Sequence, residues 1–348
     1  GTQSGISLKN YDFGGLTVPA YYKDRLANRE LSWEKTNEIN VGLDFGFFNS
    51  RINGAIDVYR RDAKDLIMER KLPSTSGWTS IWDNIGHVRN VGVELQLNTV
   101  NVQTKDFTWE TGFTFSKNHN ELIELYGGKK DDVTNKWFIG EPIDVNYDYV
   151  FDGIWQTDEA EQAAVYGQKP GQVKVRDIDG NKVIDADDKQ ILGQRSPKWI
   201  GSLTSTFRYK DFDLSVYLYT QQGAQVQDAF MSSFMTFEGN YNQLDVDYWT
   251  ENNPSNEFPQ PGNRGQYYDA MRYIDVSFVR VGSITLGWNI PKEWTKKIGI
   301  KNARLYFTTN NPFTFSSYKG FDPEWATQNT WGTVTGYTTY LIGTKIEF

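Results

Sequence analysis

In Tyr340-Leu-Ile-Gly-Thr-Lys-Ile-Glu-Phe348, the last nine residues of the chain, apolar side chains alternate with small or polar ones. In an extended strand the apolar set shares one face: Tyr340, Ile342, Ile346 and Phe348. The opposite face carries a second set: Leu341, Gly343, Lys345 and Glu347. Because successive side chains of a strand point to opposite sides, this period of two predicts a strand with one apolar and one polar face.

The same alternation recurs along the chain in segments of roughly ten residues, which is about the length that crosses a bilayer as a tilted strand. The segments are rich in β-branched and aromatic residues, which favour strands. The pattern predicts nine amphipathic strands: 38–47, 51–61, 90–98, 107–116, 198–209, 212–221, 277–288, 303–310 and 340–348. We therefore expect an all-β protein, and the recurrence of the pattern favours a transmembrane antiparallel β-barrel.

The composition argues against a helical membrane protein, because the chain contains no run of about 18 apolar residues and its mean hydropathy is −0.60. Aromatic residues make up 15% of the chain, which aromatic girdles at the two membrane interfaces would explain. One alternative remains open, namely a soluble or surface-anchored β-sandwich whose aromatic residues bind glycans.

Several kinds of chemistry have few residues to support them. The chain has no cysteine and only two histidines, His87 and His119, which lack a ligand pattern for zinc or a partner for nucleophilic catalysis. The net charge of −8 argues against nucleic acid as a partner. Adjacent acids such as Asp131-Asp132 could form a glycosidase pair, but a chain with 44 acidic residues contains such pairs by chance. We do not expect an enzyme.

The connections between the predicted strands alternate between short and long. Outer-membrane barrels keep short turns on the periplasmic side and long loops outside, so this alternation predicts a periplasmic C-terminus. The predicted extracellular segments are 1–30, 66–88, 119–197, 222–275 and 311–335. This orientation requires that residues 142–155 do not cross the membrane. Short helices are predicted at 291–298 and 158–166, the first with Pro at its start and Gly299 after its end.

Nine strands do not make a complete transmembrane barrel of the predicted kind. Single-chain bacterial barrels have even strand numbers, and an open sheet edge in lipid would leave backbone groups without partners. The opening Gly1-Thr-Gln-Ser-Gly-Ile does not resemble a native start. We therefore expect the chain to be the C-terminal part of a larger barrel.

Over essentially its whole length the chain resembles the C-terminal part of SusC-like TonB-dependent outer-membrane transporters. Matching blocks occur in order: Leu31-Ser-Trp-Glu34, Asn90-Val-Gly-Val-Glu94, Gly140-Glu-Pro-Ile143, Asp152-Gly-Ile-Trp155, Asn253-Pro254 and Gly320-Phe-Asp-Pro-Glu324. The resemblance implies a plugged barrel of about 22 strands, with the plug domain and TonB box outside residues 1–348. It also implies active import of oligosaccharides or peptides through TonB, with a SusD-like surface lipoprotein as partner.

The segment 177–188, inside the predicted outer loop 119–197, has the spacing of a calcium-binding loop. Lys182 stands at its sixth position, normally Gly, where a positive φ would cost roughly 1 kcal/mol. Ile184 would anchor the loop in apolar packing. A calcium bound here would be structural, and the alternative is a metal-free loop whose carboxylates accept backbone N–H groups. The predicted oxygen ligands are Asp177, Asp179, Asn181, Val183 through its carbonyl, Asp185 and Asp188.

Large aromatic residues are also frequent in the predicted outer loops. Such side chains can stack on sugar rings or bind a peptide or partner protein, and the alternative is packing of one loop against another. Both interpretations stay open from the sequence, which does not separate a glycan from a peptide. The residues are Trp78, Trp82, Trp137, Tyr241, Tyr248, Trp249, Tyr267, Tyr268, Trp325 and Trp331.

Overall fold

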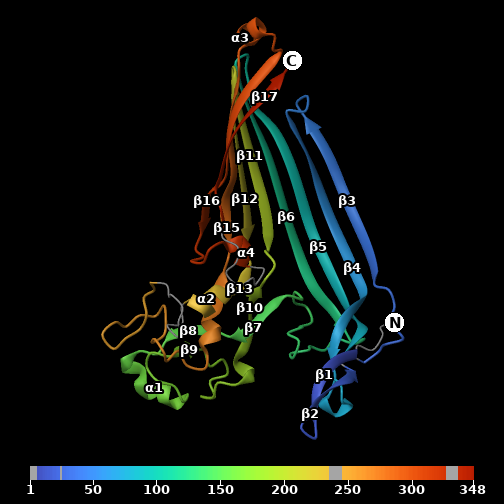
Figure 1. Cartoon of the computed structure of the whole chain (residues 1–348), viewed down its shortest axis with the longest axis vertical. Helices are drawn as coiled ribbons and strands as arrows, with labels where there is room; N and C mark the ends of the chain where they lie inside the picture. The colour runs from blue at the N-terminus through green and yellow to red at the C-terminus, as the bar shows by residue number, and fades with distance from the viewer. Residues whose placement is uncertain (1–5, 24–25, 235–244, 327–335) are drawn as a thin grey trace. The chain divides into compact units, whose positions relative to one another are not determined.

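The computed structural model describes residues 6–23, 26–234, 245–326 and 336–348, and its main feature is a nine-stranded sheet (Figure 1). The sheet order is β17-β16-β15-β12-β11-β6-β5-β4-β3, and the pairs from β6 to β17 are antiparallel. The nine strands predicted from alternation are thereby confirmed. Their bounds are β3 (Lys35–Phe47), β4 (Ile52–Lys71), β5 (Ser80–Gln103), β6 (Phe107–Leu125), β11 (Trp199–Tyr209), β12 (Phe212–Gln222), β15 (Phe278–Asn289), β16 (Asn302–Ser316) and β17 (Thr339–Glu347).

Several strands are longer than predicted at the end where the long connections lie. The segment 66–88, predicted to be an outer loop, is mostly strand: β4 continues to Lys71 and β5 begins at Ser80, so that only residues 72–79 connect them, including the short 3-10 helix η1 (Ser74–Ser76). In these extensions Met68, Ile85 and Val88 are buried in an apolar cluster, so the lipid-facing alternation ends there while the hydrogen bonding between the strands continues. In the predicted loop 1–30, β1 (Ile6–Phe13) and β2 (Leu16–Lys23) form a hairpin.

The short connections lie where they were expected. Residues 48–50 between β3 and β4 all have positive φ, and Lys210 between β11 and β12 has a φ of 50°. The predicted helix at 291–298 is present as α3 (Lys292–Thr295) followed by η5 (Lys296–Ile298), and Gly299 ends it in the left-handed conformation with a φ of 78°. The predicted helix at 158–166 is also confirmed, as η2 (Thr157–Glu159) and α1 (Ala160–Val165).

The segment 142–155, on which the predicted orientation depends, does not join the nine-stranded sheet. It forms β7 (Val145–Tyr149), which pairs with β10 (Lys189–Gln194), and β8 (Phe151–Ile154), which pairs with β9 (Val173–Val175). Residues 142–155 therefore add no strand to the nine-stranded sheet, as the predicted orientation required. The predicted alternation of connection lengths is not strict, because residues 72–79 between β4 and β5 form a shorter connection than residues 290–301 between β15 and β16.

The chain divides into two compact units, and the following description concerns the second, which contains residues 42–57, 93–117 and 144–348. Its long strands expose an apolar face: Ile342 is 77% exposed and Leu286 is 50% exposed. A water-soluble β-sandwich would bury these side chains between two sheets. An exposed apolar face of this extent indicates a surface that contacts lipid.

Aromatic pairs lie near both ends of β11 on this apolar face. Near one end Trp199 packs on Phe115, and near the other Phe207 stacks on Trp109, each with ring centroids 5.7 Å apart. The two positions on β11 are eight residues apart, or roughly 26 Å along a strand. This separation is comparable with an apolar band of about 25 Å between two aromatic girdles.

The opposite face of the same strands is polar. Arg208 donates to Glu110 at 2.6 Å, Arg304 donates to Asp213 at 2.6 Å, and the hydroxyls of Thr114 and Ser202 are 2.6 Å apart. The two faces of the sheet therefore differ as a barrel requires, with a polar side for the interior and an apolar side for lipid.

At the end of the strands opposite α3 and the C-terminus, two long insertions fold together (Figure 1). We call their described parts the loop module, residues 144–198, 223–234 and 245–277. Besides β7 to β10, η2 and α1, the module contains η3 (Ala186–Asp188), β13 (Gln225–Gln227), α2 (Ala229–Phe234), η4 (Tyr268–Arg272) and β14 (Tyr273–Asp275). After β16 comes one more short helix, α4 (Pro323–Ala326). No helix in the described ranges is long and apolar enough to cross a bilayer.

Candidate functional site

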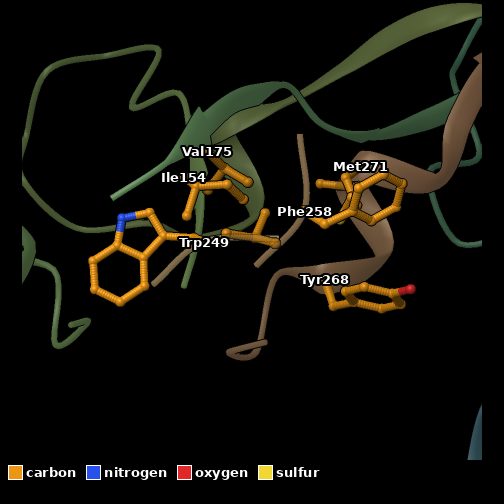
Figure 2. Close-up of a cluster of buried hydrophobic side chains, with 8 residues drawn as sticks. Ile154, Val175, Trp249, Phe258, Tyr268 and Met271 are labelled. Atoms are coloured by element: carbon orange, nitrogen blue, oxygen red, sulfur yellow. The ribbon is translucent and has the colours of Figure 1, made fainter. Parts of the chain in front are cut away.

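The loop module has its own hydrophobic core, drawn in Figure 2. Ile154 and Val173 from the first insertion pack with Trp249 and Phe258 from the second, and all four side chains are at most 4% exposed. The indole Nε1 of Trp249 donates to Oε1 of Gln156 at 3.1 Å, which satisfies its only polar atom inside the core. The two insertions are therefore held together by packing, and this gives the module a fixed surface.

This core corrects part of the predicted set of binding aromatics. Trp249 is 3% exposed and Tyr268 is 4% exposed, so neither presents a ring face to a ligand. The guanidinium of Arg264 covers the Tyr268 ring at 4.7 Å. Burial raises the pKa of Tyr268 to about 12, since the charged form would lose its hydration. For these two residues the structure favours packing of loop against loop over ligand binding.

The other predicted aromatics lie in varied surroundings. Tyr267 packs edge-on against Tyr149 at 5.2 Å beside the module core. In the first unit, Trp137 packs against a second apolar cluster that includes Leu122. Binding roles remain predictions for the aromatics that keep exposed area: Trp78, Trp82, Tyr248 and Trp325. Tyr241 and Trp331 lie outside the described residues.

The acidic segment 177–188 folds as a tight loop whose carboxylates converge. Oxygen atoms from Asp177, Asp179 and Asp188 all lie within 4.8 Å of one another. Asp188 is fully buried and accepts backbone N–H groups from Ile178 at 2.7 Å and Asp185 at 2.9 Å. Three carboxylates at this separation can bind a hard divalent cation such as calcium, because such ions prefer several oxygen ligands around one point.

Of the predicted carboxylate ligands, Asp185 does not join the convergent group. The carboxylate of Asp185 caps η3 by accepting the N–H of Asp187 at 2.9 Å, and the side-chain oxygen of Asn181 accepts the N–H of Val183 at 2.7 Å. As predicted, Ile184 packs against the module core. Ile184 thus connects the acidic loop to the hydrophobic core shared by the two insertions.

Hydrogen bonds to Asp177 shape the electrostatics of the loop. The N–H groups of Gly180 and Lys182 donate to its carboxylate at 2.7 and 2.8 Å. Desolvation alone would raise the pKa of Asp177, but these backbone hydrogen bonds together lower it below the usual value. The Tyr166 hydroxyl donates to the same carboxylate at 3.1 Å, and burial together with this contact raises the pKa of Tyr166. A carboxylate that is ionised over a wide pH range suits cation binding.

Lys182 adopts the conformation that its position in the loop requires, with a φ of 68°. Replacing Lys182 by glycine should therefore stabilise the loop by about 0.5–1 kcal/mol, because glycine has no Cβ strain at positive φ. Hydrogen exchange of the backbone amides of 177–188 measures this local stability. Lys182→Ala is the matched control, since it removes the charge and keeps the strain. If both variants increased the stability of the loop equally, the effect would come from removing the charge and not from relieving the backbone strain at residue 182.

Sequence reasoning missed a buried polar network on the polar face near the outer end of β15. Arg280, 4% exposed, donates to Asp322 at 2.6 Å and to Glu324 at 2.8 Å, and Glu324 also accepts the Tyr219 hydroxyl at 2.8 Å. The Nε of Arg280 donates to the Thr314 hydroxyl at 2.9 Å. This network connects α4 and the residue before it to β12, β15 and β16. The block Gly320-Phe-Asp-Pro-Glu324 contains both acids, but nothing in the sequence indicated which arginine they bind.

Comparisons with known proteins agree with this architecture. The family model of the TonB dependent receptor-like β-barrel matches residues 7–311. The TonB-dependent receptor SusC of Bacteroides thetaiotaomicron is 31% identical over 351 residues, which cover 97% of this chain and 34% of SusC. The TonB-dependent receptor P3 of Formosa agariphila is 31% identical over 314 residues, covering 86% of this chain and 31% of that receptor.

Among solved structures, the RagAB peptide transporter matches with a TM-score of 0.81 and 25% identity, over 99% of this chain and 38% of that chain. The chain thus spans about a third of the length of these relatives. The match extends over almost the whole chain, including the loop module and the sheet. The chain therefore belongs to the TonB-dependent receptor family and forms part of an antiparallel β-barrel in the outer membrane.

Proposed function

We propose that the chain is the C-terminal part of the barrel of a SusC-like transporter, which imports oligosaccharides or peptides across the outer membrane. The observation that carries the proposal is the similarity to SusC and RagAB over 97% and 99% of the chain. Energy would come through TonB, and the plug domain and TonB box would belong to a part of the protein that residues 1–348 do not include. The short connections and the C-terminus would face the periplasm, and the loop module would face outward.

A SusD-like surface lipoprotein is the proposed partner on the outer side. The loop module supports this assignment, because its two insertions share a core and present a defined surface beyond the strand ends. The exposed Trp325 and Tyr248 are available there for contact with a partner or a cargo molecule. A structural role in an outer-membrane assembly, without uptake, is the alternative that the experiment must separate.

Growth of a strain that lacks the gene separates uptake from a structural role. We expect slower growth when defined oligosaccharides or defined peptides are the sole nutrient, and unchanged growth on monosaccharides and free amino acids, which diffuse through porins. The full-length gene should restore growth, whereas a version with a disrupted TonB box should not. Unchanged growth on every oligosaccharide and peptide would refute import and favour the structural alternative.

We propose further that the acidic loop binds calcium in a structural role, through Asp177, Asp179 and Asp188. The convergence of three carboxylates supports this, as does the packing of Ile184 against the module core. The ion would fix the loop through its carboxylates, and no transport step requires it.

Calcium should raise the thermal unfolding midpoint of the full-length protein in detergent relative to EDTA. A free concentration 100 times the dissociation constant contributes about 2.7 kcal/mol to a state that alone binds the ion. Asp179→Asn should weaken this dependence with little other effect, because the Asp179 side chain bonds only within the exposed loop. Asp187→Asn is the control, since Asp187 is a nearby acid outside the convergent group. Equal midpoints in calcium and EDTA would contradict the proposal.

A further inference from the structure

The connection between β15 and β16 differs from the other short connections in the second unit. It contains α3 and η5 and lies at the same end of the strands as the C-terminus (Figure 1). Thr295 is its one buried residue between Pro291 and Gly299, whereas Trp294 is 58% exposed and Ile298 is 72% exposed. Exposing two large apolar side chains on a two-turn segment is unfavourable in water, so this surface requires an explanation.

The position of Trp294 shows which side of the sheet the segment occupies. Its ring lies edge-on to Trp288 with centroids 6.2 Å apart, and Trp288 stacks on Phe212 at 6.1 Å. Trp288 follows Leu286 by two residues on the exposed apolar face of β15. Trp294 thus continues the lipid-facing surface at its rim, which is the depth where tryptophan is enriched in membrane proteins. Ile298 ends the 3-10 turn that follows Trp294 and is the second large apolar side chain exposed on this segment.

The same segment is strongly basic. Residues 290–301 contain four lysines and one acid, in a chain whose net charge is −8. The other short connections, 48–51, 104–106 and 210–211, contain one basic residue each. Within the ranges that the structure describes, none of the four lysines forms an ion pair with the protein. The lysines are Lys292, Lys296, Lys297 and Lys301.

We propose that residues 290–301 bind the headgroups of anionic phospholipids, such as phosphatidylglycerol, in the membrane leaflet at the short-connection end of the barrel. Trp294 and Ile298 would lie among the acyl chains at the interface. The lysine side chains would extend along the apolar surface and place their ammonium groups at the lipid phosphates. The occupant is a lipid because the aromatic residues are continuous with the lipid-facing strands, and it is anionic because the charge is unpaired. The proposal does not depend on the cargo of the transporter.

A fluorescent label at residue 298 tests the proposal directly. The chain has no cysteine, so Ile298→Cys gives a unique site in it at a position that is 72% exposed. The full-length protein, with any cysteine outside this chain replaced by serine, is labelled with bimane and placed in nanodiscs. Brominated phosphatidylglycerol or brominated phosphatidylcholine is then added as a quencher at the same fraction.

We expect stronger quenching by phosphatidylglycerol than by phosphatidylcholine. Each lysine near an anionic surface changes local lipid occupancy by roughly fivefold at low salt, so the variant Lys296→Gln, Lys297→Gln and Lys301→Gln should lose the preference. A label at Ser50→Cys, in a short connection whose one basic residue is Arg51, is the positional control and should show a much weaker preference than the label at 298.

Three results would overturn the proposal. Equal quenching by the two lipids would mean apolar insertion without headgroup recognition. Absence of quenching by either lipid would place the segment outside the membrane. Stronger binding of lipopolysaccharide than of phosphatidylglycerol, measured by competition with the brominated lipid, would place the segment in the other leaflet.

Discussion

Replacing Arg280 by methionine should destabilise the folded protein by about 3–5 kcal/mol, the range for removing one partner of a buried ion pair. Asp322, 5% exposed, would keep its charge and lose the Arg280 guanidinium, and Glu324 would lose the same donor. Methionine is chosen because it retains much of the volume of arginine. The measurement is the urea unfolding midpoint of the full-length protein in detergent, followed by its heat-modifiable mobility on gels.

Arg208→Met is the matched control for this experiment. Arg208 also lies on a strand and binds a carboxylate, Glu110, at 2.6 Å, but the two side chains are 52% and 40% exposed. Exposed pairs contribute at most about 1 kcal/mol, so the control should change the midpoint little. The argument would fail if both arginine variants lost the same stability. Proteolysis within residues 317–326 should increase only in the Arg280 variant, since the network attaches Asp322 and Glu324 to the strands.

Replacing Trp249 by alanine should destabilise the loop module by about 3–5 kcal/mol, because the substitution leaves a large cavity in a packed core. The indole is 3% exposed and packs between residues from both insertions, so its loss weakens the contact between them. Limited proteolysis of the loop module should become faster, while the gel mobility of the barrel remains that of the folded form. Together, the two measurements distinguish unfolding of the loop module from unfolding of the whole barrel.

Trp325→Ala controls for the removal of a tryptophan at the same end of the strands. Trp325 is 38% exposed, and a partly exposed residue outside the core should cost much less when truncated. If Trp325→Ala accelerates proteolysis of the module as much as Trp249→Ala does, the module core is not the source of its stability.

The strands were predictable because lipid on one side and a polar interior on the other impose a two-residue period on the sequence. The prediction stopped where that contrast ends, at residue 61 in β4 and residue 90 in β5, although β4 continues to Lys71 and β5 already begins at Ser80. The alternation of side chains depends on what surrounds a strand. Hydrogen bonding between the backbones does not, and it therefore continues beyond the part of the strand that contacts lipid.

The acidic loop was predictable in part because its contacts are local. The positive φ of Lys182 and the packing of Ile184 follow from loop spacing alone. The burial of Trp249 depends on Ile154 and Val173, more than 70 residues earlier, so no local pattern could separate it from an exposed tryptophan such as Trp325. The partners of Arg280 could not be predicted for the same reason, since Asp322 and Glu324 come from the segment after β16.

Both insertions of the loop module lead into strands that are already paired in the nine-stranded sheet. Ile200 of β11 lies opposite Ser116 of β6, and Phe278 of β15 lies opposite Gln221 of β12. Each insertion could therefore be exchanged between related genes without shifting the register of the strands that carry it. Their shared core prevents independent exchange, because a new partner for Ile154 would have to accommodate Trp249 as well. Recombination should consequently transfer both insertions together, and sequence divergence in one should be matched by compensating divergence in the other.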